Sequence, residues 1–185
     1  DLVRINTAMR QSAIMADALA GAPAPGLLAD LGGGDGRFLL GVARRLARRW
    51  PGVRVLILDQ HDFVSRETRA GFAALGWECE VLRGDFFDLL PRIQPDIVTA
   101  NLFLHHLNEM ALVRLLGAIA ARARTFVACE PRRGRFALLG ARLVGILGAN
   151  DVTRHDAVVS VRAGFQGHDL SALWPQGESW HLSEN

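Results

Sequence analysis

Short apolar runs alternate along this chain with longer segments in which apolar residues recur at helical spacing. Five runs have the length and composition of strands: 26–32, 53–59, 78–85, 95–103 and 124–131. Helix-like segments follow the first, second and fourth of them, at 36–50, 64–76 and 109–123. Strands separated by helices pair in parallel through right-handed crossovers. The alternation therefore predicts an α/β fold, with a doubly wound, mostly parallel sheet and helices on both of its faces.

Two segments at the flanks fall outside this alternation. Residues 1–20 are expected to form an amphipathic helix, whose apolar face is made by Leu2, Ile5, Met9, Ala13 and Ala16. Residues 136–173 also have helical character, with breaks at "GAND" and "GFQGHD". Core packing accounts for most of these apolar residues. Their position also suits a cover over the carboxyl ends of the strands, where open α/β sheets bind ligands.

The composition indicates a single domain and excludes several kinds of chemistry. The chain has 185 residues and two cysteines, which suits one domain without a disulfide framework in a reducing cytoplasm. No apolar run reaches the roughly 18 residues of a membrane span. All 21 basic residues are arginine and tyrosine is absent. A phosphate-loop lysine, a lysine Schiff base and the Tyr/Lys pair of short-chain dehydrogenases are therefore excluded.

The basic residues give no support for a nucleic-acid partner. The formal net charge is only +2, and the densest cluster is Arg44, Arg45, Arg48 and Arg49 on an expected helix. Without a basic stripe elsewhere, this cluster is better explained as a solvated helix face.

A glycine cluster follows the first expected strand, in the stretch "ADLGGGDGRF" at residues 29–38. The dinucleotide fingerprint requires Gly-x-Gly-x-x-Gly, but Arg37 and Leu39 occupy the places of its third glycine. The pattern present is Gly-x-Gly-x-Gly, with Asp30 ahead of it and Asp35 inside it. Two acids suit a ligand with a cationic amino group better than a pyrophosphate.

With these residues the chain resembles the class I S-adenosylmethionine-dependent methyltransferases, which have a Rossmann-like fold. The resemblance implies S-adenosylmethionine as cofactor and S-adenosylhomocysteine as product. It assigns Asp59 to the ribose hydroxyls and Asp85 with Phe86 to adenine. The cofactor-binding residues implied are Asp30, Gly32, Gly33, Gly34, Gly36, Asp59, Gln60, Asp85, Phe86 and Asn101.

The resemblance also implies a layout for the whole chain. We expect one methyltransferase domain with a helical cap at 1–24, a cofactor-binding core at 25–130, a helical substrate cap at 131–175 and the start of the last strands at 176–185. The family's sheet ends with a sixth parallel strand and an antiparallel seventh. The stretch "ESWHLSE" could begin one strand but has no partner, so we expect the C-terminal antiparallel strand to be missing through truncation.

The candidate catalytic residues come from the loop "LFLHHLNEM". It resembles the Leu-His-Asp-Trp segment of small-molecule O-methyltransferases, in which the histidine deprotonates the substrate hydroxyl. The resemblance makes His105 the base and Glu130 the carboxylate that orients it, although His106 and Leu107 replace the Asp and Trp. A neutral imidazole is a suitable base at neutral pH. A structural start to a helix is the competing explanation of His105, and His155 is the alternative base.

The sequence therefore predicts methyl transfer to a small molecule, with O-methylation favoured and an apolar or aromatic acceptor. Base-amine methylation is disfavoured because "NLFL" replaces Asn/Asp-Pro-Pro-aromatic, and neither cysteine follows a proline as cytosine C5 methylation requires. A catalytically silent cofactor-binding subunit and an NAD(P)-dependent oxidoreductase remain as alternatives. We expect no metal, and a homodimer is left open.

Overall fold

The computed structural model of the chain describes residues 2–130, 165, 167–175 and 180–183, with the side chains of the first helix described from residue 10 onward. The chain divides into two compact units. The first comprises Asp1–Asn101 with Ala118–Cys129, and the second comprises Leu102–Gly117 with Glu130–Asn185.

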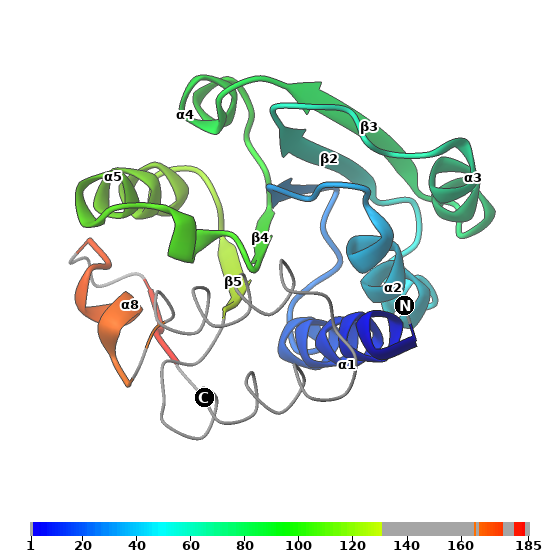
Figure 1. The fold of residues 1–185 in the computed structure, drawn as a ribbon, viewed down its shortest axis with the longest axis horizontal. Coiled ribbons are helices and arrows are strands. Elements are labelled where there is room, and N and C mark those ends of the chain that lie inside the picture. The colour runs from blue at the N-terminus through cyan, green and yellow to red at the C-terminus, as the bar shows by residue number, and fades with distance from the viewer. Residues whose placement is uncertain (1, 131–164, 166, 176–179, 184–185) are drawn as a thin grey trace. The chain divides into compact units, whose positions relative to one another are not determined.

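The first unit is built on a five-stranded sheet in which every pairing is parallel, in the order β3-β2-β1-β4-β5. The strands, seen as arrows in Figure 1, are β1 (Leu27–Leu31), β2 (Arg54–Asp59), β3 (Glu78–Arg83), β4 (Ile97–Asn101) and β5 (Thr125–Cys129). The prediction of a doubly wound parallel sheet is confirmed. The strand order reverses between β1 and β4, and open α/β sheets bind ligands outside the carboxyl ends of the strands at such a point.

The three longer helices of this unit lie where the sequence pattern places them, whereas the short helix after β3 was not predicted. The helices are α1 (Leu2–Leu19), α2 (Arg37–Leu46), α3 (Arg66–Ala74) and the short α4 (Phe86–Leu89), which continues into a 3-10 turn η1 (Leu90–Arg92). Ser65 caps α3 by accepting a hydrogen bond from the Thr68 N–H at 3.2 Å. Gly76, just beyond the end of α3, has a φ of 74°, as expected of a glycine that terminates a helix.

A single apolar core joins α1, α2 and α3 to one face of the sheet, and α1 and α2 lie side by side (Figure 1). The buried face of α1 is formed by Ser12, Met15, Ala16 and Leu19. It is turned slightly from the predicted face, because Ala16 is buried whereas Ala13 is only half-buried. Arg49 fixes the end of α1 by donating to the Ala20 carbonyl at 2.6 Å.

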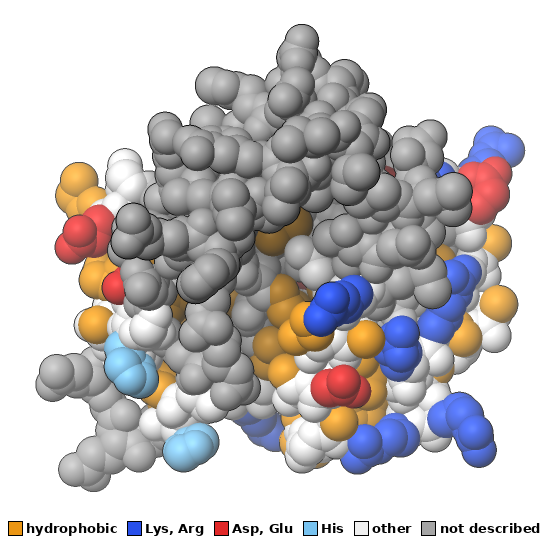
Figure 2. Space-filling model, turned by 60° about the horizontal axis from the view of Figure 1, so that its bottom comes forward, with side chains coloured by type: hydrophobic (Ala, Val, Ile, Leu, Met, Phe, Trp, Pro, Cys, Tyr) orange, Lys and Arg blue, Asp and Glu red, His pale blue; other side chains and the backbone are white. Residues whose placement is uncertain are grey.

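The arginine cluster at the end of α2 and in the turn after it lies on the surface. Arg44, Arg45, Arg48 and Arg49 are all exposed, as the sequence predicts for a solvated face. In Figure 2 the described arginines are dispersed among acidic and apolar side chains. Every helix in the described part of the chain is too short or too polar to cross a lipid bilayer.

The second unit contains a 3-10 turn η2 (Leu104–His106), most of α5 (Glu109–Ala120) and the short α8 (Asp169–Ala172). The predicted helical stretch 136–173 falls largely outside the described residues, and α8 lies at its end. The predicted start of a strand in 176–185 is absent from its described part, since residues 180–183 have no regular secondary structure.

Candidate active site

The glycine turn after β1 depends on backbone conformations that side chains disfavour. Gly32, Gly34 and Gly36 have φ values of 63°, 54° and 71°, in the left-handed region that glycine enters without strain. The Gly32 N–H donates to the Leu58 carbonyl at 2.9 Å, which fastens the turn to the end of β2. The next residue after Gly36 begins α2. The spacing of the three glycines therefore turns the chain sharply from strand to helix.

Gly33 is needed for a different reason, which is close packing. A Cβ atom on Gly33 would lie 2.5 Å from Asp30 Oδ2 and 2.9 Å from Ile57 Cγ2. Both distances are shorter than real Cβ contacts. The turn therefore rests directly on the Asp30 carboxyl group, and any side chain at this position would lift it.

Asp30 is a buried acid in the middle of the sheet. Its side chain is 1% exposed, and Oδ1 accepts a hydrogen bond from the Thr99 hydroxyl at 2.6 Å. Burial raises the pKa of Asp30 to about 7, against the opposing effect of the Thr99 hydrogen bond and with a further increase from the charge of Asp59. The carboxyl group of Asp30 is therefore covered by the glycine turn.

Asp59, at the end of β2, holds the turn from the other side. Its Oδ2 accepts a hydrogen bond from the Gly34 N–H at 3.1 Å, and its Oδ1 accepts one from the His61 N–H at 3.1 Å. Each carboxylate oxygen keeps a lone pair for another donor, and the side chain is only half-buried. Asp59 can therefore still accept hydrogen bonds from a diol. The neighbouring Gln60 is exposed.

Asp85 and Phe86 lie beyond β3, whose end is paired with the end of β2 through Asp59 and Arg83. Asp85 caps α4 by accepting a hydrogen bond from the Phe87 N–H at 2.8 Å, so the simple capping role is present. The carboxylate is nevertheless exposed. It can also accept a hydrogen bond from an exocyclic amine, next to an aromatic ring that can pack on a planar base.

Asn101 ends β4, on the other side of the reversal in strand order. Its Oδ1 atom is buried and has no hydrogen-bond partner among the described residues. A buried acceptor without a donor is costly in a folded protein, and a ligand with N–H or O–H groups would relieve that cost. The unpartnered Oδ1 of Asn101 and the carboxylate of Asp59, which can accept hydrogen bonds from a diol, both fit a polar, nucleoside-like cofactor.

In the second unit, His105 and Glu130 form a buried pair. His105 Nδ1 lies 2.7 Å from Glu130 Oε2, and the two side chains are 4% and 5% exposed. The same carboxylate accepts hydrogen bonds from the Phe103 and Leu104 N–H groups, both at 2.8 Å. Glu130 therefore fixes both the η2 turn and the orientation of the His105 ring, and Nε2 is the ring nitrogen that Glu130 does not contact.

Leu102, two residues before η2, has a φ of 53°. A left-handed conformation is rare for a leucine and costs free energy that the surroundings must offset. The hydrogen bonds from Phe103 and Leu104 to Glu130 supply that constraint. Strain of this kind is concentrated at functional sites.

His106 lies beside the candidate base, and His155 is the alternative base. The His106 ring lies 4.1 Å from that of His105, measured between centroids. Burial lowers the pKa of His106, and so does the proximity of His105, while Glu130 opposes the change. His155 lies outside the described residues.

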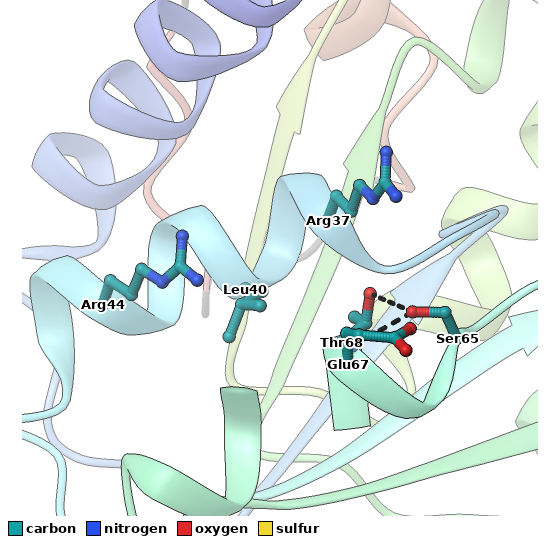
Figure 3. Close-up of a pocket in the computed structure, with 6 residues that line it drawn as sticks. All are labelled: Arg37, Leu40, Arg44, Ser65, Glu67 and Thr68. Atoms are coloured by element: carbon teal, nitrogen blue, oxygen red, sulfur yellow. Dashed lines mark hydrogen bonds between the residues drawn. The ribbon is translucent and has the colours of Figure 1, made fainter. Parts of the chain in front are cut away.

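A separate groove of about 260 Å³ lies between α2 and α3, lined by Arg37, Leu40, Arg44, Ser65, Glu67 and Thr68. Figure 3 shows both arginine side chains extending from α2 away from the Ser65 cap. The glycine turn does not line this groove. Within the described residues, no three His, Cys, Asp or Glu side chains are grouped so as to hold a metal ion.

A profile of the O-methyltransferase domain family matches residues 6–131. The chain belongs to this family. The matched segment contains the glycine turn, Asp59, Asp85, His105 and Glu130. No curated protein sequence gives a significant match.

Solved structures share the fold of this O-methyltransferase domain at low sequence identity. An O-methyltransferase family protein from Burkholderia thailandensis is 19% identical, with a TM-score of 0.56 over 89% of this chain and 50% of its own. The mitomycin 7-O-methyltransferase MmcR is 21% identical, with a TM-score of 0.56 over 90% of this chain and 46% of its own. The plantazolicin methyltransferase BamL, solved with SAH and a triazolic desmethylPZN analog, is 15% identical, with a TM-score of 0.58 over 92% of this chain and 62% of its own. The chain thus spans about half the length of the structures it matches.

Thr99 is the functional candidate that sequence reasoning missed. It lies inside a continuous apolar strand, and nothing in the spacing marks it. The register pairs Asp30 with Thr99 across β1 and β4, and only a known strand order would have revealed that neighbour.

Proposed function

We propose that this protein transfers the methyl group of S-adenosylmethionine to a small-molecule acceptor, with O-methylation favoured. The observation that carries the proposal is the position of Asp59 near the reversal in strand order. Its carboxylate accepts a hydrogen bond from the Gly34 N–H and keeps lone pairs for a ligand. The family match and the SAH bound in the BamL structure support this choice of cofactor.

The cofactor-binding residues are assigned by their positions along the carboxyl edge of the sheet. Asp59 accepts hydrogen bonds from the ribose hydroxyls, and Asp85 with Phe86 binds adenine. Asn101 offers its orphaned Oδ1 to a donor of the cofactor. The glycine turn lets the backbone approach closely, with Gln60 beside it. When bound, the cofactor supplies an activated methyl group on a sulfonium sulfur.

His105 is proposed as the general base. Glu130 holds Nδ1, so that Nε2 is the nitrogen available to take the proton from an acceptor hydroxyl. The oxygen that loses this proton becomes the nucleophile for methyl transfer. His155 is the alternative base and belongs to the proposed substrate cap at 131–175.

The acceptor is proposed to be apolar or aromatic, and the cap segments select it. Two of the solved structures are methyltransferases named for mitomycin and plantazolicin, and these names support a small-molecule acceptor. A single methyltransferase domain and a cytoplasmic location complete the proposal, and the oligomeric state is left open. The alternative of a catalytically silent subunit shares the same cofactor site and differs only in turnover.

Calorimetry tests the cofactor assignment. We expect micromolar binding of S-adenosylhomocysteine, about −8 kcal/mol, and much weaker binding of NAD. Asp59→Ala should weaken the S-adenosylhomocysteine complex by about 1.5–3 kcal/mol, the usual effect of losing hydrogen bonds to a charged group. Asp88→Ala, which removes an exposed carboxylate on α4, is the matched control and should leave the affinity unchanged. Tighter binding of NAD would overturn the assignment.

A turnover assay separates the enzyme from the silent subunit. The protein is incubated with labelled S-adenosylmethionine and a metabolite extract, and the labelled product is identified. Methylation of a small molecule supports the proposal, whereas cofactor binding without any labelled product supports the silent subunit.

A further inference from the structure

Thr99 is buried at the centre of the sheet, at a position that the reaction itself does not require to be polar. Its side chain is 0% exposed and lies on β4 directly across from Asp30 on β1. The neighbour of Asp30 on its other side is the apolar Ile57 on β2. A hydroxyl group in this apolar setting is unusual, and its hydrogen bond to Asp30 Oδ1 at 2.6 Å is short.

We propose that Thr99 is a positioning residue of the cofactor site, whose hydrogen bond favours the ionised form of Asp30 beneath the glycine turn. The proposal rests on the proposed function, because it concerns the same cofactor. Beyond that function, it assigns a role to Thr99, which would not contact the cofactor. It also predicts that Asp30 releases a proton when the cofactor binds.

The geometry couples Asp30 to whatever binds at the turn. Asp30 Oδ2 lies directly under Gly33, where even a methyl group has no room. A negative charge at this place attracts a cationic group above the turn, and the low dielectric of the interior strengthens that attraction. S-adenosylmethionine has two such groups, its ammonium and its sulfonium, whereas S-adenosylhomocysteine keeps only the ammonium.

The groups that face Asp30 have opposing effects on its ionisation. Asp59 on β2 opposes ionisation by repulsion, and Thr99 on β4 favours it by donating a hydrogen bond. Cys79 on β3 feels the same charge, since Asp30 helps to raise the pKa of that thiol. The charged residues of α2, which are Arg37, Arg44 and Arg45, are all exposed. With its pKa raised to about 7, Asp30 is only partly ionised in the free protein at neutral pH.

A cationic ligand therefore binds the ionised form and displaces the proton. The affinity for S-adenosylhomocysteine should rise about five- to ten-fold from pH 6 to pH 8 and then level off. At pH 7, calorimetry in buffers of different ionisation enthalpy should detect the release of about half a proton. 5′-Methylthioadenosine lacks the amino-acid group, so its binding should release no proton. Asp30→Asn should bind S-adenosylhomocysteine without this pH dependence.

Thr99→Val removes the hydroxyl and keeps the shape of the side chain. Without the hydrogen bond, the pKa of Asp30 rises further, and we expect S-adenosylhomocysteine to bind about ten-fold more weakly at pH 7. The loss should shrink as the pH is raised to 8.5. Thr99→Ser restores the donor and should restore both the affinity and the pH profile.

The outcomes separate this inference from the proposed function. A Thr99→Val loss that is equal at every pH would show a merely structural role and overturn the inference. The same conclusion follows if the wild-type protein releases no proton with S-adenosylhomocysteine, a measurement that needs no variant to fold. Failure of the wild-type protein to bind S-adenosylhomocysteine at any pH would instead contradict the proposed function.

Discussion

At the residue scale, the most informative contact is the one between Glu130 and the η2 turn. One carboxylate accepts hydrogen bonds from three backbone N–H groups and also contacts the His105 ring. A role in shaping the turn and a role in orienting a base are therefore combined in the same side chain. A test of His105 has to separate them.

Replacing His105 by alanine removes the ring and leaves Glu130 bonded to the Phe103 and Leu104 N–H groups. If Nε2 takes the acceptor proton, turnover should fall about 10²–10⁴-fold, with little change in cofactor affinity. His106→Ala is the matched control, because its ring is adjacent to that of His105, and it should keep turnover close to the wild-type level. The measurement is initial rate with saturating cofactor.

Glu130→Gln gives a second reading of the same pair. The amide oxygen can still accept from Phe103 and Leu104, but the NH₂ group then faces His105 Nδ1 and favours the wrong tautomer. We expect a smaller loss than in His105→Ala, and the double variant should lose little more than His105→Ala. Near-normal turnover of His105→Ala combined with an inactive His155→Ala would place the base in the cap region instead.

At the scale of elements, the glycine turn and α5 place opposite demands on glycine. In the turn, Gly33 leaves room for the Asp30 carboxyl group beneath it, and a Cβ there has no space. In α5, Gly117 has no atom within 4 Å of the place of its Cβ. The same substitution should therefore have opposite effects at the two sites.

Gly33→Ala should lower the free energy of unfolding by about 1–3 kcal/mol, as overpacking does elsewhere, and should weaken cofactor binding. Gly117→Ala should raise the free energy of unfolding by about 0.5–1 kcal/mol, because alanine restricts the unfolded chain and favours a helix. Urea unfolding of both variants beside the wild-type protein checks the signs. A stable Gly33→Ala variant with normal affinity would mean that the turn is not pressed against Asp30.

At the scale of the whole molecule, the buried carboxyl group of Asp30 reduces the stability of the first unit at neutral pH. Asp30 occupies a fully buried position where an apolar residue would pack without desolvating a charge. Its pKa is raised from 3.8 to about 7, so between those pH values the native protein holds a proton that the unfolded chain has lost. The contribution of this group to stability is therefore present at acid pH and is lost as the pH rises towards 7 and above.

Asp30→Asn should remove this pH dependence. Relative to wild type, the variant should become more stable by about 2–3 kcal/mol as the pH rises from 5 to 8, which is the part within this window of the roughly 4 kcal/mol set by the full shift from 3.8 to about 7. Urea unfolding at several pH values gives the difference directly, and titrations common to both proteins cancel. A difference that does not change with pH would show that Asp30 keeps an ordinary pKa in the folded protein.

The sequence by itself determined the fold class and the order of the elements. Branched aliphatic runs such as 53–59 and helical spacing such as that of 109–123 are local signals, which depend only on neighbours along the chain. The glycine turn was also predictable, because the left-handed φ values at Gly32, Gly34 and Gly36 favour glycine, and glycine is visible in the sequence. The strands to which Asp30 and Asp59 belong were equally clear.

The tertiary structure alone decided which of these residues meet. The register of β1 with β4 brings Thr99 to Asp30, the end of β2 brings Asp59 to Gly34, and the fold brings Glu130 to His105. These contacts join residues 25 to 69 positions apart, and their burial sets the pKa of Asp30. Hydrogen bonds and desolvation depend on distances in space, which spacing along a chain does not contain.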